Sequence, residues 1–361
     1  MIRERLGIKI EKQLHTSPLV SFSIPFLAII LALLVEGVFL FLSGYNPLQV
    51  YGVLFKGAFG TWYCLSESIV TAIPLILTGL GVSIAFRMVL WNIGGEGQLY
   101  MGAFAASWVA LSFPDAPAFI LQPAMFLAGF IGGALWGLLP ALPRALKGVN
   151  ETLTTLMLNY VAIFWVGYLV YGPWRDPQSF NFPITTEFSK SAVLPHLGNT
   201  RIHAGILIAL VLVVVVYFVM RHTAWGYEIR VAGESRQAAN YAGINVVRNI
   251  LLVMLISGGL CGLAGYCEVA GIFRRLQHTI SPGYGYTAII VAWLAKLNPW
   301  AIVAVAFLFG GLIAGGYTMQ AAGLPSTTVT MLQGVILFFV LGGEIFTRYR
   351  IRLYKKGGVN L

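Results

Sequence analysis

Charged residues are scarce in this sequence. Of its 361 residues only 10% are Asp, Glu, Lys or Arg, whereas 58% are hydrophobic. Ordinary soluble domains carry about 25% charged residues. Several apolar runs also reach the roughly 20 residues that a helix needs to cross a bilayer. These features exclude an ordinary soluble domain and predict an all-α, polytopic membrane protein.

The sequence also lacks the usual signatures of enzymes and nucleic-acid binding. It contains no G-x-x-x-x-G-K-[ST], H-E-x-x-H, G-x-S-x-G or C-x-x-C motif. Its cysteines number only three, and Cys261 and Cys267 lie in or near an apolar run, which favours small buried residues over disulfides or metal ligands. The net charge of +10 comes from basic residues at helix ends. We therefore expect no enzymatic activity, no cofactor or metal in this chain and no nucleic-acid partner.

Apolar runs predict about ten transmembrane helices. The eighth is short for a full span, so we expect it to be broken, tilted or re-entrant, and the third is open to the same doubt. The predicted segments are 19–42, 68–87, 97–113, 118–140, 152–171, 203–220, 249–270, 284–297, 300–320 and 326–345.

The placement of basic residues predicts the topology. With the N-terminus in the cytoplasm, most of the 23 lysine and arginine residues fall on the inner side. We therefore expect a cytoplasmic segment at 1–18, a single transmembrane domain at 19–345 and a basic cytoplasmic tail at 346–361. Residues 221–248 form a cytoplasmic loop, and 172–202 the long external loop.

The chain also repeats weakly. GVNETLTTLML (148–158) aligns with GLPSTTVTMLQ (323–333), and GGEGQ (94–98) resembles PGYGY (282–286) at a similar offset. Segments 2–5 and 7–10 would then be two copies with opposite orientation. Inverted repeats with glycine-broken segments are typical of transporters, in which the substrate path lies where the copies meet.

The loop 221–248 is the longest polar stretch between two apolar runs. Within it, 234–245 reads as a short helix with Ala238, Ala239, Tyr241, Ala242 and Ile244 on one mostly apolar face. A helix this short is marginal alone and must dock on something. Composition leaves open whether it is a solvated loop or a coupling helix for a soluble motor.

Four stretches carry a resemblance to a known family. They are GYEIRVAGESRQAANYAGI (226–244), WNIGGEGQLYMGAFAA (91–106), GVNETLTTLMLNY (148–160) and ISPGYGYTAIIVAWLAKLNP (280–299). The first resembles the coupling segment of permease subunits of bacterial ABC importers, and all four resemble the branch for branched-chain amino acids, simple sugars and nucleosides. The similarity covers nearly the whole chain and is greatest to nucleoside and simple-sugar permeases.

The resemblance implies a set of partners. A cytoplasmic ABC ATPase would hold the ATP and Mg²⁺, a second permease subunit (a different chain or a copy) would complete the pore, and an external binding protein or lipoprotein would deliver the solute. The membrane would be the bacterial plasma membrane. The residues implied in coupling to the ATPase are Glu228, Arg230, Gly233, Glu234, Arg236, Ala238, Ala239, Tyr241, Gly243 and Ile244.

Polar and aromatic residues at the repeat motifs are candidates for the pathway or its gates. They are Asn92, Glu96, Gln98, Asn159, Arg275, Gln277, Tyr284, Tyr286 and Gln333. Each has a structural alternative: a helix cap for Glu96, interhelical hydrogen bonds for the amides, and interface anchors for the arginine and tyrosines. The central parts of the repeated spans lack charged residues, which favours a neutral solute. The alternative function is a self-sufficient secondary carrier or channel.

Overall fold

The structure, a computed structural model, describes residues 5–12, 18–198, 200–325 and 327–356. The chain divides into two units. Unit 1 comprises Met1–Leu54 and Met319–Leu361, and unit 2 comprises Phe55–Thr318. Helices α2 (Pro47–Phe59) and α12 (Pro299–Ala321) contain the boundaries between the units.

Unit 1 is built on two helices from opposite ends of the chain. Helix α1 (Pro18–Leu42) packs along α13 (Thr327–Arg348). Strands β1 (Arg5–Lys12) and β2 (Tyr349–Lys356) pair antiparallel, with Arg5 opposite Lys356. This ribbon was not expected from the sequence. The rest of the predicted terminal segments, at 1–4, 13–17 and 357–361, lies outside the described residues.

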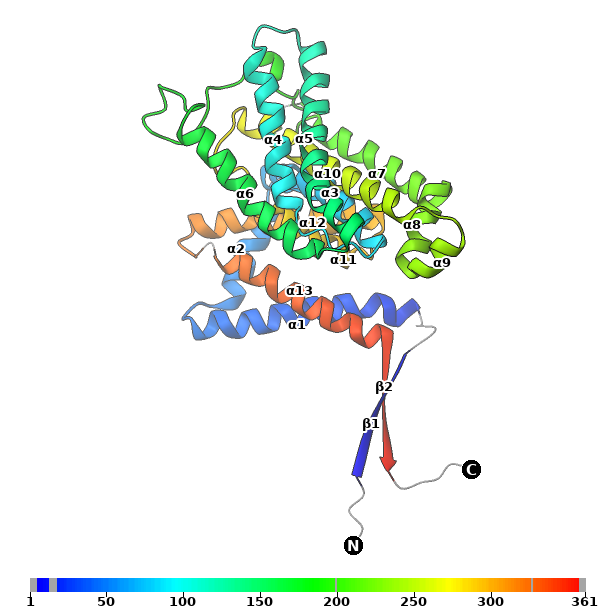
Figure 1. Ribbon diagram of the computed structural model, residues 1–361. Coiled ribbons are helices and arrows are strands. Elements are labelled where there is room, and N and C mark those ends of the chain that lie inside the picture. The colour runs from blue at the N-terminus through cyan, green and yellow to red at the C-terminus, as the bar shows by residue number, and fades with distance from the viewer. Residues whose placement is uncertain (1–4, 13–17, 199, 326, 357–361) are drawn as a thin grey trace. The chain divides into compact units, whose positions relative to one another are not determined.

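Unit 2 is a helical bundle (Figure 1). Its elements are α3 (Trp62–Arg87), α4 (Gly95–Ser112), α5 (Ala118–Lys147), α6 (Glu151–Tyr171), the 3-10 turn η1 (Lys190–Ala192), α7 (Gly205–His222), α8 (Ala224–Glu234), α9 (Arg236–Tyr241), α10 (Val246–Glu268), the π-helical turn η2 (Val269–Phe273), α11 (Tyr284–Leu294) and most of α12. Helices α3 and α10 are buried along most of their length, whereas α6 and α7 are peripheral.

Glycines let the central helices approach closely. A Cβ atom on Gly102 of α4 would lie 2.2 Å from Cα of Gly262 of α10, and one on Gly133 of α5 would lie 2.2 Å from the carbonyl oxygen of Gly258. Side chains at these points are therefore excluded. Packing through small residues is the usual way in which helices associate in lipid, and the sequence contains 41 glycines.

The helices confirm a multi-pass membrane protein but not the count of ten spans. Among the described residues, six helices are long and apolar enough to cross a membrane, or seven if α1 and α2, which are bent by 120°, count as one span. Helix α11 has 11 residues, so the predicted eighth segment is indeed short.

Several predicted boundaries were wrong. Helix α2 was missed, α3 begins at Trp62 rather than 68, and α5 continues to Lys147 rather than 140. The cause of the second error is a hydroxyl cap: Thr61 accepts a hydrogen bond from the Cys64 amide and starts the helix before its apolar part. Helix α5 tolerates Pro140 and Pro143 and ends at Gly148, whose φ of +70° suits glycine.

Candidate functional site

The predicted coupling helix is two helices instead of one. Residues 234–245 do not form a continuous helix, because α8 ends at Glu234 and α9 spans only Arg236–Tyr241. Ser235 separates them in an extended conformation, and its hydroxyl accepts a hydrogen bond from the Ala238 amide. The serine is therefore an N-cap that interrupts the predicted helix.

The predicted apolar face of this segment is only partly buried by the rest of the chain. Ala239 is fully buried, but Ala238 and Ala242 are exposed and Tyr241 is 98% exposed. Ile244 is half-buried, and Gly243 takes a left-handed φ of +74° at the end of α9. Helix α9 thus rests on one alanine and presents most of its surface outward.

Helix α8, in contrast, is fixed to the bundle. A Cβ atom on Gly233 would lie 2.1 Å from the carbonyl oxygen of Arg87 at the end of α3. The Asn249 amide of α10 donates to Glu228 at 2.8 Å and accepts from the Trp225 indole at 3.0 Å. Arg230 donates to the carbonyl of Met220. Glu228, Arg230 and Gly233 therefore anchor the segment, while Glu234 and Arg236 are exposed.

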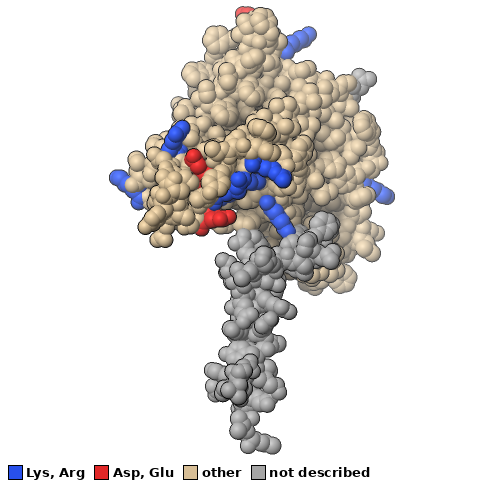
Figure 2. Space-filling model, turned by 90° about the vertical axis from the view of Figure 1, so that its right-hand side faces the viewer, with Lys and Arg blue, Asp and Glu red and all other residues tan. Residues whose placement is uncertain are grey.

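Basic side chains surround this segment. A cavity of about 190 Å³ beside it is lined by Arg87, Arg221, Arg230 and Lys296, among others. Figure 2 views the molecule from the side that carries α7, α8 and α9. On this side, Lys and Arg lie in a band along one margin of a wide uncharged surface. This arrangement is that of a membrane-facing surface next to a polar rim.

A buried polar network surrounds the break between α3 and α4. Asn92 and Gln98 exchange two amide hydrogen bonds of 3.0 and 3.1 Å, and Asn92 also donates to the Ser257 hydroxyl of α10 at 2.9 Å. Asn159 of α6 accepts from the Gly97 amide at 2.8 Å and donates to the Ile93 carbonyl at 2.9 Å. Side chains of α6 therefore hydrogen-bond to the backbone of the break, and α10 contributes a hydrogen bond to the Asn92 side chain.

Glu96 joins the two glycine-rich motifs. It lies in the first turn of α4, and its Oε2 accepts a 2.7 Å hydrogen bond from the Gly285 amide in the first turn of α11. A Cβ on Gly285 would lie 2.1 Å from the Glu96 nitrogen, so only glycine permits this contact. A carboxylate here faces the positive ends of two helix dipoles. The motifs GGEGQ and PGYGY, which the repeat analysis paired, are thus in direct contact.

The structure brings together five of the nine pathway candidates. Asn92, Glu96, Gln98 and Asn159 are buried at the helix break, and Tyr286 reaches it through a 3.2 Å hydrogen bond from Asn159. The contacts of Asn92, Gln98 and Asn159 are the interhelical or local amide hydrogen bonds of the structural alternative. Glu96, in contrast, bonds to α11 and does not cap its own helix, and Tyr286 is bonded to Asn159. No observation tests the pathway role itself, which stays a prediction.

The other four candidates lie elsewhere. Tyr284 is buried at the start of α11, where its amide donates to Ser281. Arg275 pairs with Glu187 at 3.8 Å, and Gln277 bridges to Ile184, both in contact with the external loop. Gln333 lies on α13 in unit 1.

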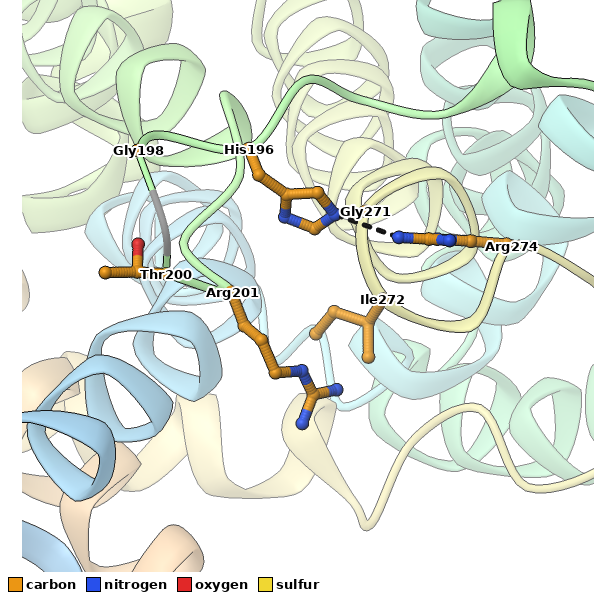
Figure 3. Close-up of a pocket in the computed structure, with 7 residues that line it drawn as sticks. All are labelled: His196, Gly198, Thr200, Arg201, Gly271, Ile272 and Arg274. Carbon is orange, nitrogen blue, oxygen red and sulfur yellow. Dashed lines mark hydrogen bonds between the residues drawn. The ribbon is translucent and has the colours of Figure 1, made fainter.

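The predicted external loop is held to the segment after α10 by backbone hydrogen bonds. Phe188 donates to the Arg274 carbonyl at 2.8 Å, and Leu194 to the Ala270 carbonyl at 2.9 Å. A cavity of about 360 Å³ lies between the loop and this segment (Figure 3). In it, a guanidinium nitrogen of Arg274 lies 3.2 Å from Nε2 of His196, and Arg201 and Ile272 also line the space. Arg201 pairs with Glu67 at 3.0 Å. The cavity is therefore lined by two arginines and a histidine, and Glu67 offsets the charge of Arg201.

Two buried polar residues were missed by sequence reasoning. Ser257 completes the network of Asn92, but a serine within an apolar run gives no signal by itself. Glu268 is 1% exposed near the end of α10, and its Oε1 has no hydrogen-bond partner within the described part of the chain. The signal that could have identified Glu268 is an acidic residue within the apolar run 249–270. Because it lies near the end of that run, it resembles an ordinary charged residue at a helix end.

These observations define a multi-pass membrane protein with a hydrogen-bonded helix break and an exposed short helix, α9, next to the anchored helix α8. Residues 64–341 match the family described as "Branched-chain amino acid transport system / permease component". The chain belongs to this family of ABC transporter permeases, as the four sequence stretches predicted.

Three relatives of known substrate name are similar to the chain over most of its length. A glucose ABC transporter permease protein of Haloferax volcanii is 37% identical, over 92% of this chain and 90% of the relative. A guanosine ABC transporter permease protein of Bacillus subtilis is 36% identical, over 92% and 97%. A nucleoside ABC transporter permease protein of Lactococcus lactis is 31% identical, over 88% and 90%.

Proposed function

We propose that this chain is a membrane subunit of an ATP-driven importer for a nucleoside or a simple sugar. The observation that carries the proposal is the α8–α9 pair: one helix locked to the bundle and one projecting from it. A motor that moves α9 would therefore move α3 and α10 through Gly233 and Asn249. Family membership supplies the kind of motor, an ABC ATPase, which would hold the ATP and Mg²⁺.

Alternating access would act on the helix break. Ten spans with inverted repeats and both termini in the cytoplasm fit the proposal best. In that arrangement, Glu96 and Gly285 mark the point where the repeats touch. Closure of the ATPase would reorient α4 and α11 about this point, where their first turns are in close backbone contact and the Glu96 carboxylate hydrogen-bonds across them.

The substrate proposal rests on the relatives and on the site. Glucose, guanosine and nucleosides are the solutes in the relatives' names. They are neutral rings with polar edges. The network of Asn92, Gln98 and Asn159 carries amides and no cation, which suits solutes of this kind.

The remaining partners follow from surfaces. We propose that the external loop 172–202 and the cavity beside it receive an external binding protein. For the second permease, a different chain is favoured over a copy, because two different Bacillus subtilis chains, 36% and 26% identical to this one, share the name of guanosine permease. The bacterial plasma membrane is the proposed location.

The test is uptake of labelled nucleosides and sugars into cells carrying this chain and its neighbouring transport genes. The matched control replaces the Walker A lysine of the ATPase. We expect uptake of one solute class, abolished by the lysine replacement. Uptake that persists without a functional ATPase would instead establish a secondary carrier or channel.

A further inference from the structure

One face of α6 is exposed and aromatic. Its residues recur at intervals of three or four along the helix and are each 50–70% exposed. This spacing places them on a single face. They are Leu153, Met157, Tyr160, Phe164, Tyr168 and Tyr171.

Depth in the membrane makes Tyr160 unusual. Helix α6 has 21 residues and is therefore about 30 Å long, and Tyr160 lies about 14 Å from its start. This is close to the middle of a bilayer, whereas tyrosines in contact with lipid gather at the two interfaces. The Tyr160 hydroxyl makes no hydrogen bond to any residue that the structure describes. A hydroxyl left unpaired in hydrocarbon is costly, so lipid is a poor neighbour for this face.

The same face adjoins the polar network. Tyr286 of α11 is 36% exposed and is hydrogen-bonded to Asn159, the residue that precedes Tyr160 in α6. The Tyr286 hydroxyl accepts from Asn159, which also binds the Gly97 amide at the helix break. Towards the outer end of α6, the Tyr171 ring meets His278 edge-on at 5.7 Å. Aromatic groups thus lead from the outer end of α6 to the buried amides.

We propose that Tyr160, Phe164, Tyr168 and Tyr286 line the route of the solute and stack on its ring. This inference rests on the proposed import function and assigns it residues. A sugar ring and a nucleobase each present a flat apolar face to an aromatic side chain, and the tyrosine hydroxyls meet their polar edges. A succession of such weak contacts lets the solute advance without being trapped.

The first test asks whether water reaches this face. Cysteines replace Tyr160 or Phe164 in the assembled transporter, in a Cys64→Ala background, since Cys261 and Cys267 are fully buried. Val211→Cys and Val214→Cys on the exposed face of α7 are matched controls. A charged thiosulfonate reagent needs a thiolate and hence water. We expect Tyr160→Cys and Phe164→Cys to react and the transported solute to slow the reaction, with both α7 controls inert.

Either of two results would overturn the proposal. One is that Tyr160→Cys is as inert as Val211→Cys, which would place the face in lipid or against a partner helix. The other is that it reacts but no transported solute protects it, which would leave a wet surface without a ring contact.

The second test uses the native cysteines and measures uptake kinetics. Tyr160→Leu should raise KM about tenfold, whereas Tyr160→Phe, which keeps the ring, should raise it less than about threefold. Trp108→Leu, which removes an equally exposed ring of α4, should change nothing. Equal effects of Tyr160→Leu and Trp108→Leu on KM would contradict the proposal. If the unmodified transporter takes up none of the solutes, the import function fails instead, and the labelling pattern still reports on the route.

Discussion

Helices α6 and α7 are both peripheral in unit 2 and lie at opposite edges of it in Figure 1. They differ, however, in the side chains that they expose and in those that they bury. The exposed side of α7 carries Leu207, Val211 and Val214, and that of α6 carries Tyr160 and Tyr168. Hydropathy alone makes both of them spans. Two helices that both pass as membrane spans by hydropathy can therefore expose very different side chains at mid-depth.

Their buried sides differ as well. Helix α7 buries Ala209 and Val213, which are held by packing. Helix α6 buries Thr155 and Asn159, which hydrogen-bond to the backbone of 93–97. Under the proposed function, the C-terminal end of α7 is important because it leads into α8 and α9, whereas α6 is important along its whole length. The following predictions test this difference between the two helices.

The largest effect is expected beyond the end of α7. The double change Glu234→Arg and Arg236→Glu reverses two exposed charges next to α9. Uptake should fall about 100-fold while the amount of folded protein in the membrane stays normal, because these side chains have no packing role. Uptake and chain abundance are measured together. Normal uptake would contradict the coupling role of α9.

A smaller loss of uptake is expected from Gly233→Ala. The added methyl would lie 2.1 Å from the Arg87 carbonyl and must displace α8 from α3. Uptake should fall about tenfold. The matched control is Gly148→Ala after α5, which meets nothing within 4 Å and only strains a φ of +70°, at a cost of about 1–2 kcal/mol. Equal effects of the two changes would show that α8 does not transmit motion through this contact.

The buried sides are compared by stability. Asn159→Leu leaves the Gly97 amide, the Ile93 carbonyl and the Tyr286 hydroxyl without their partner. We expect a loss of about 2–4 kcal/mol. Val213→Ala on α7 should cost about 1 kcal/mol. Thermal unfolding in detergent measures both, and a smaller loss for Asn159→Leu would mean that water replaces its hydrogen bonds.

The smallest effect is expected on the exposed side of α7. Val214→Leu exchanges one aliphatic side chain for another at a 50% exposed position. Stability should change by less than about 0.5 kcal/mol, and uptake should not change. A clear loss of uptake would show that α7 faces a partner helix instead of lipid.

The sequence predicted what depends on hydropathy. The membrane class and the short eighth segment could be predicted from the residues, because each depends on local composition. The interruption of the helix at Ser235 could not be predicted. The residues around it continue a helical pattern, and only the hydrogen bond from the Ala238 amide to the Ser235 hydroxyl shows that a new helix begins there. The partners of Asn159 and Glu96 lie 62–66 and 189 residues away along the chain. Such contacts are set by packing, and no local pattern encodes them.

The exposure of Tyr241 shows the same limit. An apolar face was predicted for α9 from five residues, but only Ala239 is fully buried. Helical periodicity identifies residues that share a face, and it assigns that face to the protein's own core by default. An interaction surface has the same pattern as a core.

The most direct test of the account places a photoreactive amino acid at Tyr241 and, in a matched variant, at Phe180. These aromatic residues are 98% and 92% exposed, one on α9 and the other in the predicted external loop. In the assembled transporter, the account predicts that position 241 crosslinks to the ATPase and position 180 does not. An ATPase adduct from position 180, or none from position 241, would contradict it.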